Sequence, residues 1–200
     1  MITSYEDYVF YLEADRIALN RKTKKPRIIG DEIWKYQRLL RKVEYYSNCK
    51  NHFPWKAYLL YLRFKRRYYG IYLGGFEISV NSFGPGLSIA HLGYVVVNPH
   101  ARIGENCRIH AGVYIASQVG DGNFEKAPSI GNNVYIGPGV KMFGEITIAD
   151  DIAIGANAVV NKSFTEPGIS IGGIPAKKIS DKGSHELIIN ATAIVKGRSP

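Results

Sequence analysis

Three histidines between residues 91 and 110, His91, His100 and His110, are the side chains of most interest for moving protons near neutral pH. A histidine can accept the proton that an alcohol loses while its oxygen attacks a carbonyl group, which typically contributes about 10²–10⁴-fold to the rate. No serine or cysteine lies in a recognisable nucleophile motif. Because a lone histidine is more often structural than catalytic, the surrounding elements decide which of the three can do chemistry.

The second half of the chain repeats with a period of six residues. Aliphatic residues or Met begin the hexads at Val97, Ile103, Ile109, Ile115, Ile130, Ile136, Met142, Ile148, Ile154 and Val160. Small or apolar residues follow four positions later at Ala101, Cys107, Val113, Val119, Val134, Val140, Ile146, Ile152, Ala158 and Phe164. A helical period of 3.6 would scatter these positions around the axis. A period of six predicts a three-sided coil in which each hexad is one short strand and a corner.

Two irregularities interrupt the repeat, and such deviations often form the binding face of a solenoid. The gap between Ile115 and Ile130 holds nine extra residues, 121–129 (DGNFEKAPS), which predict a polar loop. Upstream, residues 80–104 have repeat-like aliphatics with imperfect spacing, and His91 lies within them. The position of His91 in this stretch makes it the histidine of greatest interest.

The first 75 residues differ in charge and composition from the rest. They hold 16 Lys and Arg against 7 Asp and Glu, whereas residues 76–200 hold 10 of each, and 11 of the 14 tyrosines precede residue 76. Helices are predicted at 5–19, 31–48 and 54–69, the second from the apolar stripe Ile33, Tyr36, Leu40 and Val43. We therefore predict a basic, Tyr-rich helical subdomain at 1–75, a β-helix domain at 76–180 and a C-terminal tail at 181–200.

Composition narrows the partners and the location. Aromatic and basic residues alternate at 58–69, but a tyrosine-rich helical pack with a solvated basic face explains them better than nucleic-acid binding does. A basic face also attracts anionic substrates or membrane surfaces that carry lipid-linked sugars. The N-terminus lacks a basic signal region, no early apolar run approaches the roughly 20 residues of a membrane span, and Cys49 and Cys107 make no disulfide framework. We expect a cytoplasmic protein with access to the inner face of the membrane.

Together with the hexads, three phrases carry a family resemblance: NSFGPGLSIAHLG at 81–93, EKAP at 125–128 and GGIPAKKI at 172–179. They resemble the serine acetyltransferase branch of the hexapeptide-repeat acyltransferases, and more closely the short members that O-acetylate capsular or other surface polysaccharides. The resemblance covers residues 31–180. It implies a mainly β fold, a left-handed parallel β-helix with an N-terminal helical subdomain, a homotrimer, and acetyl-CoA in the groove between subunits.

The resemblance assigns roles to matching residues. His91 matches the catalytic histidine, although Ala90 stands where the family has an aspartate. Ser79 matches the aspartate that orients this histidine, and residues 126–128 (KAP) match the Arg-His-Pro that recognises an amino-acid acceptor. These changes favour a sugar hydroxyl over serine and leave the orienting partner of His91 open among Ser79, Asn81 and a backbone carbonyl. The implied acceptor-binding residues are Ser79, Asn81, Glu125 and Lys126.

The implied co-substrate is acetyl-CoA, without a metal. The family match points to contacts with CoA at Ser117, Pro138, Ala153, Ala156, Lys177 and Lys178. His110 follows an aliphatic start and would point outward near the CoA groove, but it is not counted among the site residues. Trimeric β-helix carbonic anhydrases bind zinc through three histidines, but the spacing of residues 91, 100 and 110 does not match theirs, and we find no second set of converging ligands.

The sequence therefore predicts an acetyl-CoA-dependent O-acetyltransferase that acts by direct transfer to a hydroxyl of a sugar or surface-polysaccharide precursor. His91 would be the general base and would afterwards protonate the departing CoA thiolate. Serine O-acetyltransferase is the alternative within the same chemistry. A non-catalytic trimeric scaffold is the alternative of another class.

Overall fold

The computed structural model describes residues 1–50, 52–118 and 123–197. Four helices are α1 (Tyr5–Ala18), α2 (Glu32–Cys49), α3 (Trp55–Tyr72) and α4 (Ala191–Lys196). The strands of the five-stranded sheet are β1 (Phe76–Ile78), β3 (Val95–Val97), β6 (Val113–Ala116), β9 (Lys141–Phe143) and β12 (Val159–Val160). The three-stranded sheet holds β4 (Arg102–Ile103), β7 (Ser129–Ile130) and β10 (Thr147–Ile148). The six-stranded sheet holds β2 (Ser88–Ile89), β5 (Arg108–Ile109), β8 (Tyr135–Ile136), β11 (Ala153–Ile154), β13 (Ser170–Gly172) and β14 (Lys177–Ser180).

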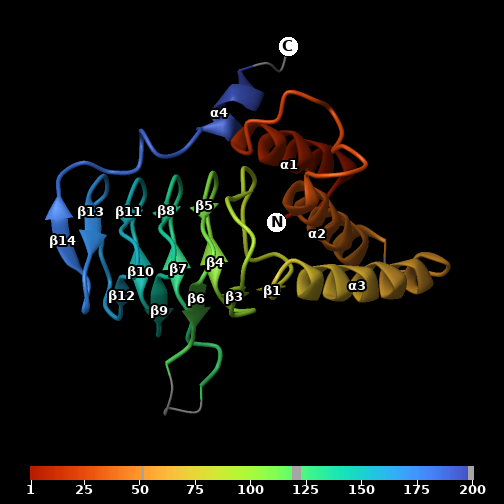
Figure 1. Cartoon of the computed structure of the whole chain (residues 1–200). Coiled ribbons are helices and arrows are strands. Elements are labelled where there is room, and N and C mark those ends of the chain that lie inside the picture. The colour runs from red at the N-terminus through yellow and green to blue at the C-terminus, as the bar shows by residue number, and fades with distance from the viewer. Residues whose placement is uncertain (51, 119–122, 198–200) are drawn as a thin grey trace.

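These three sheets are the sides of one left-handed parallel β-helix (Figure 1). All ten aliphatic hexad starts are buried, so the hexad pattern correctly identified the interior. Residues one turn apart pair in parallel, for example Val97 with Ile115 and Ile109 with Ile136. Among the strands of the described residues, only β14 runs antiparallel, against β13. Val119 and the first two residues of the predicted loop 121–129 lie outside the described residues.

One corner of the solenoid is held by a ladder of polar side chains. Asn106, Asn133 and Asp151 each have a positive φ, between 55° and 60°, which the short side chains of Asn and Asp tolerate. The Asn106 amide donates to Asn133 at 2.9 Å, and the Asn133 amide donates to Asp151 at 3.0 Å. The same residues therefore form the corner and connect consecutive turns.

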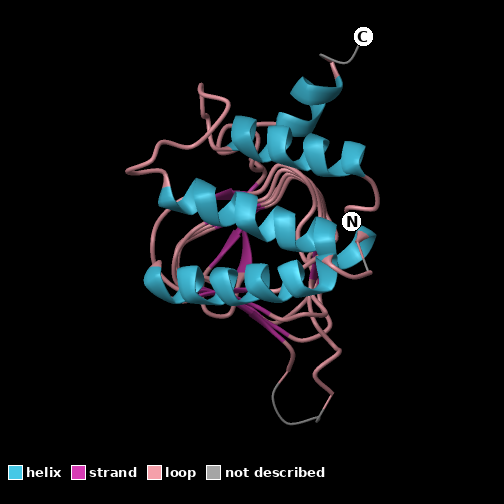
Figure 2. Cartoon of the chain, turned by 90° about the vertical axis from the view of Figure 1, so that its right-hand side faces the viewer, coloured by secondary structure: helices cyan, strands magenta, loops and turns pink. Residues whose placement is uncertain are grey.

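The N-terminal helices lie across the first turn of the solenoid (Figure 2). The three predicted helices form within a few residues of their expected bounds, and α1 begins with a capping box between Ser4 and Asp7. Helix α3 continues to Tyr72, beyond the predicted end at residue 69, and Gly70 in its last turn lets the helix pack closely on the chain that follows it. A Cβ at Gly70 would lie 2.7 Å from the Phe76 carbonyl oxygen. No helix in the described part of the chain is long and apolar enough to span a bilayer.

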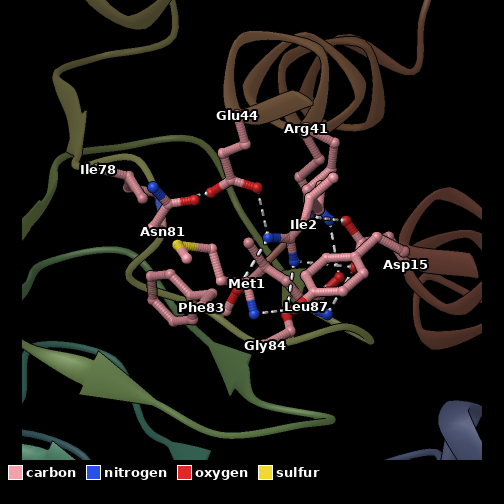
Figure 3. Close-up of polar contacts among 12 residues, drawn as sticks. Met1, Ile2, Asp15, Arg41, Glu44, Ile78, Asn81, Phe83, Gly84 and Leu87 are labelled. Carbon is pink, nitrogen blue, oxygen red and sulfur yellow. Dashed lines mark hydrogen bonds and ion pairs between the residues drawn. The ribbon is translucent and has the colours of Figure 1, made fainter. Parts of the chain in front are cut away.

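A buried charged network joins α1 and α2 to the solenoid (Figure 3). The fully buried guanidinium of Arg41 donates to Asp15 at 2.8 Å, to Glu44 at 3.0 Å and to the carbonyl oxygens of residues 83 and 84. Asp15 also accepts the backbone N–H groups of residues 86 and 87. Burial alone would lower the pKa of Arg41, but the attraction of Asp15 and Glu44 outweighs it and holds that pKa above its ordinary value.

Residues 181–197 return along the outside of the solenoid and end in α4, beside α1 (Figure 1). The sequence left the order of this tail open. Asn106 holds it there, because its amide donates to Asn190 and to the Thr192 hydroxyl and its oxygen accepts the Thr192 N–H. The ladder at one corner thus also anchors the end of the described chain.

Candidate functional site

His91 lies at the corner where the six-stranded sheet passes into the five-stranded sheet. It follows β2 by two residues and is exposed. Further turns stack beneath this corner in register: the Ala90 N–H donates to the Ile109 carbonyl oxygen, the His110 N–H to that of Ile136, and the Gly137 N–H to that of Ile154. Ala90, His110 and Gly137 therefore occupy one row along the solenoid axis. We call this row, together with His91, which directly follows Ala90, the histidine edge.

A second histidine packs against the first. The ring centroids of His91 and His110 are 5.4 Å apart, and Tyr135 lies 5.1 Å from His110. His110 is 9% exposed. Burial, followed by the nearby Arg108 and His91, lowers the pKa of His110, so its imidazole is neutral at pH 7. His100 is exposed and follows β3, on the other side of the five-stranded sheet.

The four predicted acceptor-binding residues do not gather around His91. Ser79 ends the first strand of the five-stranded sheet and its hydroxyl donates to the Val97 carbonyl oxygen at 3.4 Å. Asn81 pairs with Asn48 of α2, at 2.9 Å between amide nitrogen and oxygen. Glu125 and Lys126 belong to the loop after β6, and Lys126 lines a separate hollow of about 360 Å³. Ser79 and the loop after β6 lie at the far end of the five-stranded side, at the corner opposite His91. One side of the coil is roughly 15–20 Å long at about 3.3 Å per residue, and this length separates the two corners within one chain.

A cavity of about 900 Å³ lies between α3 and the first three strands of the five-stranded sheet. Ser79 and Asn98 line its sheet side. Arg63, Arg66 and Arg67 line its helix side. Arg66 donates to the Ile78 carbonyl oxygen, while its Nε atom is buried and has no hydrogen-bond partner among the described residues. We call this hollow the arginine cavity.

The residues predicted to contact CoA divide among four places. Pro138 and Ala156 follow Gly137 and Gly155, so they lie on turns of the histidine edge. Ala153 is buried in β11 on the neighbouring side. Ser117 is buried at the opposite corner, beside the loop. Lys177 and Lys178 are in β14 at the far end of the solenoid, where Lys178 pairs with Glu166 and Asp181 at 2.6 Å each.

Sequence reasoning missed the contact between His91 and His110. It expected His110 to point outward near the CoA groove and left it out of the site, whereas the structure buries His110 against His91. The matching positions of residues 90 and 110 in consecutive turns are the signal that could have brought the two histidines together. Among the described residues, no group of three His, Cys, Asp or Glu side chains is arranged to hold a metal ion.

Comparison with known proteins identifies the family, although no family model matches the chain. A serine acetyltransferase of Helicobacter pylori strain 26695 is 35% identical over 120 residues, an alignment that covers 54% of this chain and 68% of the relative. The chain belongs to the serine acetyltransferase family. A serine acetyltransferase of Staphylococcus xylosus is 36% identical over 110 residues, which cover 54% of this chain and 50% of that protein.

Solved structures support the same fold. A serine acetyltransferase from Brucella abortus superposes with a TM-score of 0.66 at 22% identity, over 90% of this chain and 72% of that one. The Neisseria gonorrhoeae enzyme gives 0.67 at 24% identity, over 88% and 68%. A Brucella abortus serine acetyltransferase in complex with coenzyme A gives 0.63 at 22% identity, over 89% and 68%.

Membership in this family makes the chain an acetyl-CoA-dependent O-acetyltransferase, as the sequence predicted, with acetyl-CoA as its co-substrate. The alternative of a non-catalytic scaffold is not supported. The names of these relatives favour serine, the alternative acceptor, over the sugar hydroxyl that was the first prediction. The departures at Ser79, Ala90 and residues 126–127 remain the features in which this chain differs from the family pattern.

Proposed function

We propose that this acetyltransferase transfers acetyl from acetyl-CoA to a sugar hydroxyl of a surface-polysaccharide precursor, with His91 as general base. The observation that carries the choice of base is the exposure of His91 at a corner of the solenoid. A base must reach both a thioester and an incoming alcohol, and an imidazole exposed to solvent is accessible to both.

The reaction needs one proton to move twice. His91 accepts the proton of the hydroxyl while the alcohol oxygen bonds to the thioester carbonyl carbon. When the carbon–sulfur bond breaks, the imidazolium returns the proton to the CoA thiolate. The products are the acetyl ester and free CoA, and the histidine ends in its starting state.

The thioester arm of acetyl-CoA would lie along the histidine edge. Pro138 and Ala156, which lie on later turns next to this edge, would form the wall of its path. Lys177, toward the far end of the same solenoid, would meet the nucleotide phosphates. Ala153, Ser117 and the salt-bridged Lys178 have less support as direct contacts, because the first two are buried and the third already has two carboxylate partners.

The arginine cavity would hold the acceptor. Cavities of about 300–1,000 Å³ are typical for ligands much larger than a single amino acid. Its three guanidinium groups suit an acceptor that carries phosphate or carboxylate, as nucleotide-linked and lipid-linked sugar precursors do. Ser79 in its wall supports the acceptor-binding role predicted for this residue. Asn98, also in this wall, donates to the Phe124 carbonyl oxygen, which brings the loop with Glu125 and Lys126 close to the cavity although neither residue lines it.

The separation of the arginine cavity from His91 within one chain supports a homotrimer in which neighbouring copies share each site. Co-expression of His91→Ala with an Arg63→Ala/Arg67→Ala double variant tests this arrangement. If one copy supplies the base and its neighbour the cavity, mixed trimers recover about a quarter of wild-type activity by random assembly. Activity no greater than that of the two variants assayed alone would contradict the shared site.

L-serine is the second candidate acceptor, favoured by the names of the relatives. The purified protein can be assayed for CoA release with L-serine, with free monosaccharides and with UDP-N-acetylglucosamine at equal concentrations. We expect a sugar acceptor to exceed L-serine by about tenfold or more, because the residues matching the amino-acid-recognising positions are changed. A preference for L-serine would overturn the sugar assignment and leave the base intact.

Substitution of the base tests the mechanism. His91→Ala should lower kcat by about 10²–10⁴-fold. His100→Ala, which removes another exposed histidine, should stay within about twofold of wild type. Retention of more than a tenth of the activity by His91→Ala, with correct folding and assembly, would refute His91 as the base.

A further inference from the structure

The family pattern orients its catalytic histidine with an aspartate, and this chain has Ser79 at that position. Ser79 lies at the opposite corner from His91 and donates to the Val97 carbonyl oxygen. Asn81, the other side chain considered for the role, is paired with Asn48 on α2. The side chain that the structure places against the His91 ring is instead His110, with 5.4 Å between ring centroids.

Three observations distinguish His110 from an ordinary packing histidine. Its ring is 9% exposed, so it is held in one place by its surroundings. Its Nε2 atom is buried and has no hydrogen-bond partner among the described residues, which is uncommon because buried polar atoms are normally paired. Its far side packs against Tyr135 at 5.1 Å, which limits how the ring can turn.

The distance between the two rings suits a hydrogen bond. An imidazole nitrogen lies about 1.2 Å from its ring centre, so a nitrogen–nitrogen hydrogen bond of about 3 Å places the two centres roughly 5.3 Å apart. Catalytic hydrogen bonds often tighten only when substrates bind, and the exposed His91 ring is free to rotate toward its neighbour.

We propose that His110 is a positioning residue that accepts a hydrogen bond from His91 at Nε2 and so fixes the His91 ring and its tautomer. The other ring nitrogen of His91 then presents its lone pair to the acceptor hydroxyl. When His91 takes the proton, His110 keeps the hydrogen bond to the imidazolium. This inference rests on His91 being the base, as proposed above.

The groups that face His110 favour its neutral form. Arg108 on its own strand and His91 from the preceding turn both disfavour a positive charge, and Tyr135 from the following turn brings none. Only a neutral imidazole has a lone pair to accept from His91. Acidification that protonates His110 should therefore remove the hydrogen bond and place a like charge beside the imidazolium.

Kinetics of His110→Ala and His110→Asn test the proposal, with His100→Ala as the matched control. We expect His110→Ala to lower kcat by about 10–100-fold, the usual loss for a residue that orients another, while KM for acetyl-CoA changes less than about twofold. His110→Asn should recover part of the loss, because its amide oxygen accepts a hydrogen bond. A kcat within twofold of wild type for His110→Ala would overturn the proposal.

Nitrogen-15 NMR of the histidine rings gives a test that does not depend on turnover. In the wild-type protein we expect a single His91 tautomer that becomes a mixture in His110→Ala and is partly restored in His110→Asn, whereas a purely structural role would leave the tautomers unchanged. If His91→Ala keeps its activity, the proposed function fails. If His91→Ala loses activity while His110→Ala keeps both its rate and the His91 tautomer, only the present inference fails.

Discussion

The N-terminal helices and the β-helix are stabilised in different ways. The solenoid interior is a continuous stack of aliphatic side chains, each contributed by a short strand whose backbone bonds to the turns above and below. Helix α2 adds Tyr36 and Leu40 to that apolar core, and α1 and α2 also contact the first turn through a fully buried guanidinium, Arg41, with two carboxylates around it. The solenoid is thus stabilised by many similar apolar turns, whereas the helices depend on a buried charged network in addition to their apolar contacts.

This difference teaches where a single substitution can act. A lost methylene in the solenoid leaves a local cavity, whereas a lost charge in the network leaves its partners buried and unpaired. The histidine edge and the arginine cavity both lie on the first turns of the solenoid, where the two regions meet. The charged network therefore bears on the geometry of the site as well as on stability.

The largest effect is expected from Arg41→Leu. Removing the guanidinium leaves Asp15 and Glu44 buried without a counter-charge, at a cost of about 3–5 kcal/mol of unfolding free energy. Chemical denaturation followed by circular dichroism measures it. Lys35→Ala on the same helix, which removes the partly exposed pair with Glu32, should cost less than about 1 kcal/mol. Equal losses for both variants would show that the buried network contributes no more than a partly exposed ion pair.

Met142→Ala probes the other side of the comparison. Met142 is fully buried in β9, and its truncation should cost about 2–5 kcal/mol through lost burial and a residual cavity. Hydrogen exchange should show increased opening around β9 in this variant, and around α1 and α2 in Arg41→Leu. If both variants open the same amides, the two regions unfold as one unit.

The polar ladder should respond more weakly. Asn106→Ala removes the bonds to Asn133, Asn190 and Thr192 and places alanine at a positive φ, for a loss of about 1–3 kcal/mol. Asn106→Gly loses the same bonds, but glycine adopts a positive φ without strain. It should therefore be more stable than Asn106→Ala by about 0.5–1 kcal/mol. Thermal unfolding of both variants measures the difference, and an Ala variant at least as stable as the Gly variant would refute the backbone argument.

The smallest effect concerns pH. The pKa of His110 is lower in the folded protein than in the unfolded chain, where an unperturbed histidine has a pKa of about 6.5. As pH falls through that value, the unfolded chain binds a proton that the folded protein does not, so stability declines until the folded pKa is reached. His110→Asn should lose less stability between pH 7.5 and 5.5 than wild type. Parallel curves for the two proteins would contradict the assignment.

Much of the solenoid was predictable because its interior pattern is local. Hexad starts such as Ile109 and Met142 are buried for the reason the period implied, since one residue in six must face the axis of a three-sided coil. The helices were predictable from stripes and caps, but the close contact between Gly70 of α3 and the Phe76 carbonyl oxygen is one that no local pattern reveals. The start of the predicted loop 121–129 stays a prediction, because residues 121 and 122 lie outside the described part of the chain.

The site was less predictable, because its members come from different turns. His91 could be found from its motif, but the companion of its ring could not, because Ser79 and Asn81 lie closer in the sequence and His110 closer in space. From the sequence, the arginines of α3 were interpreted as a basic face exposed to solvent. In the structure α3 packs beside the first strands, and three of these arginines line a cavity.

By itself, the sequence determined the coiled architecture and its apolar interior, because both follow from the six-residue spacing of aliphatic residues. It also determined the transferase chemistry and the base we propose for it, because these depend on short contiguous motifs. The tertiary structure alone decided which side chains meet across turns: Arg41 with Asp15 and Glu44, Asn106 with the C-terminal helix, and His110 with His91. The reason is physical. Stacking in a solenoid brings together residues a whole turn apart, and the length of each turn depends on corners and insertions that the local sequence does not fix.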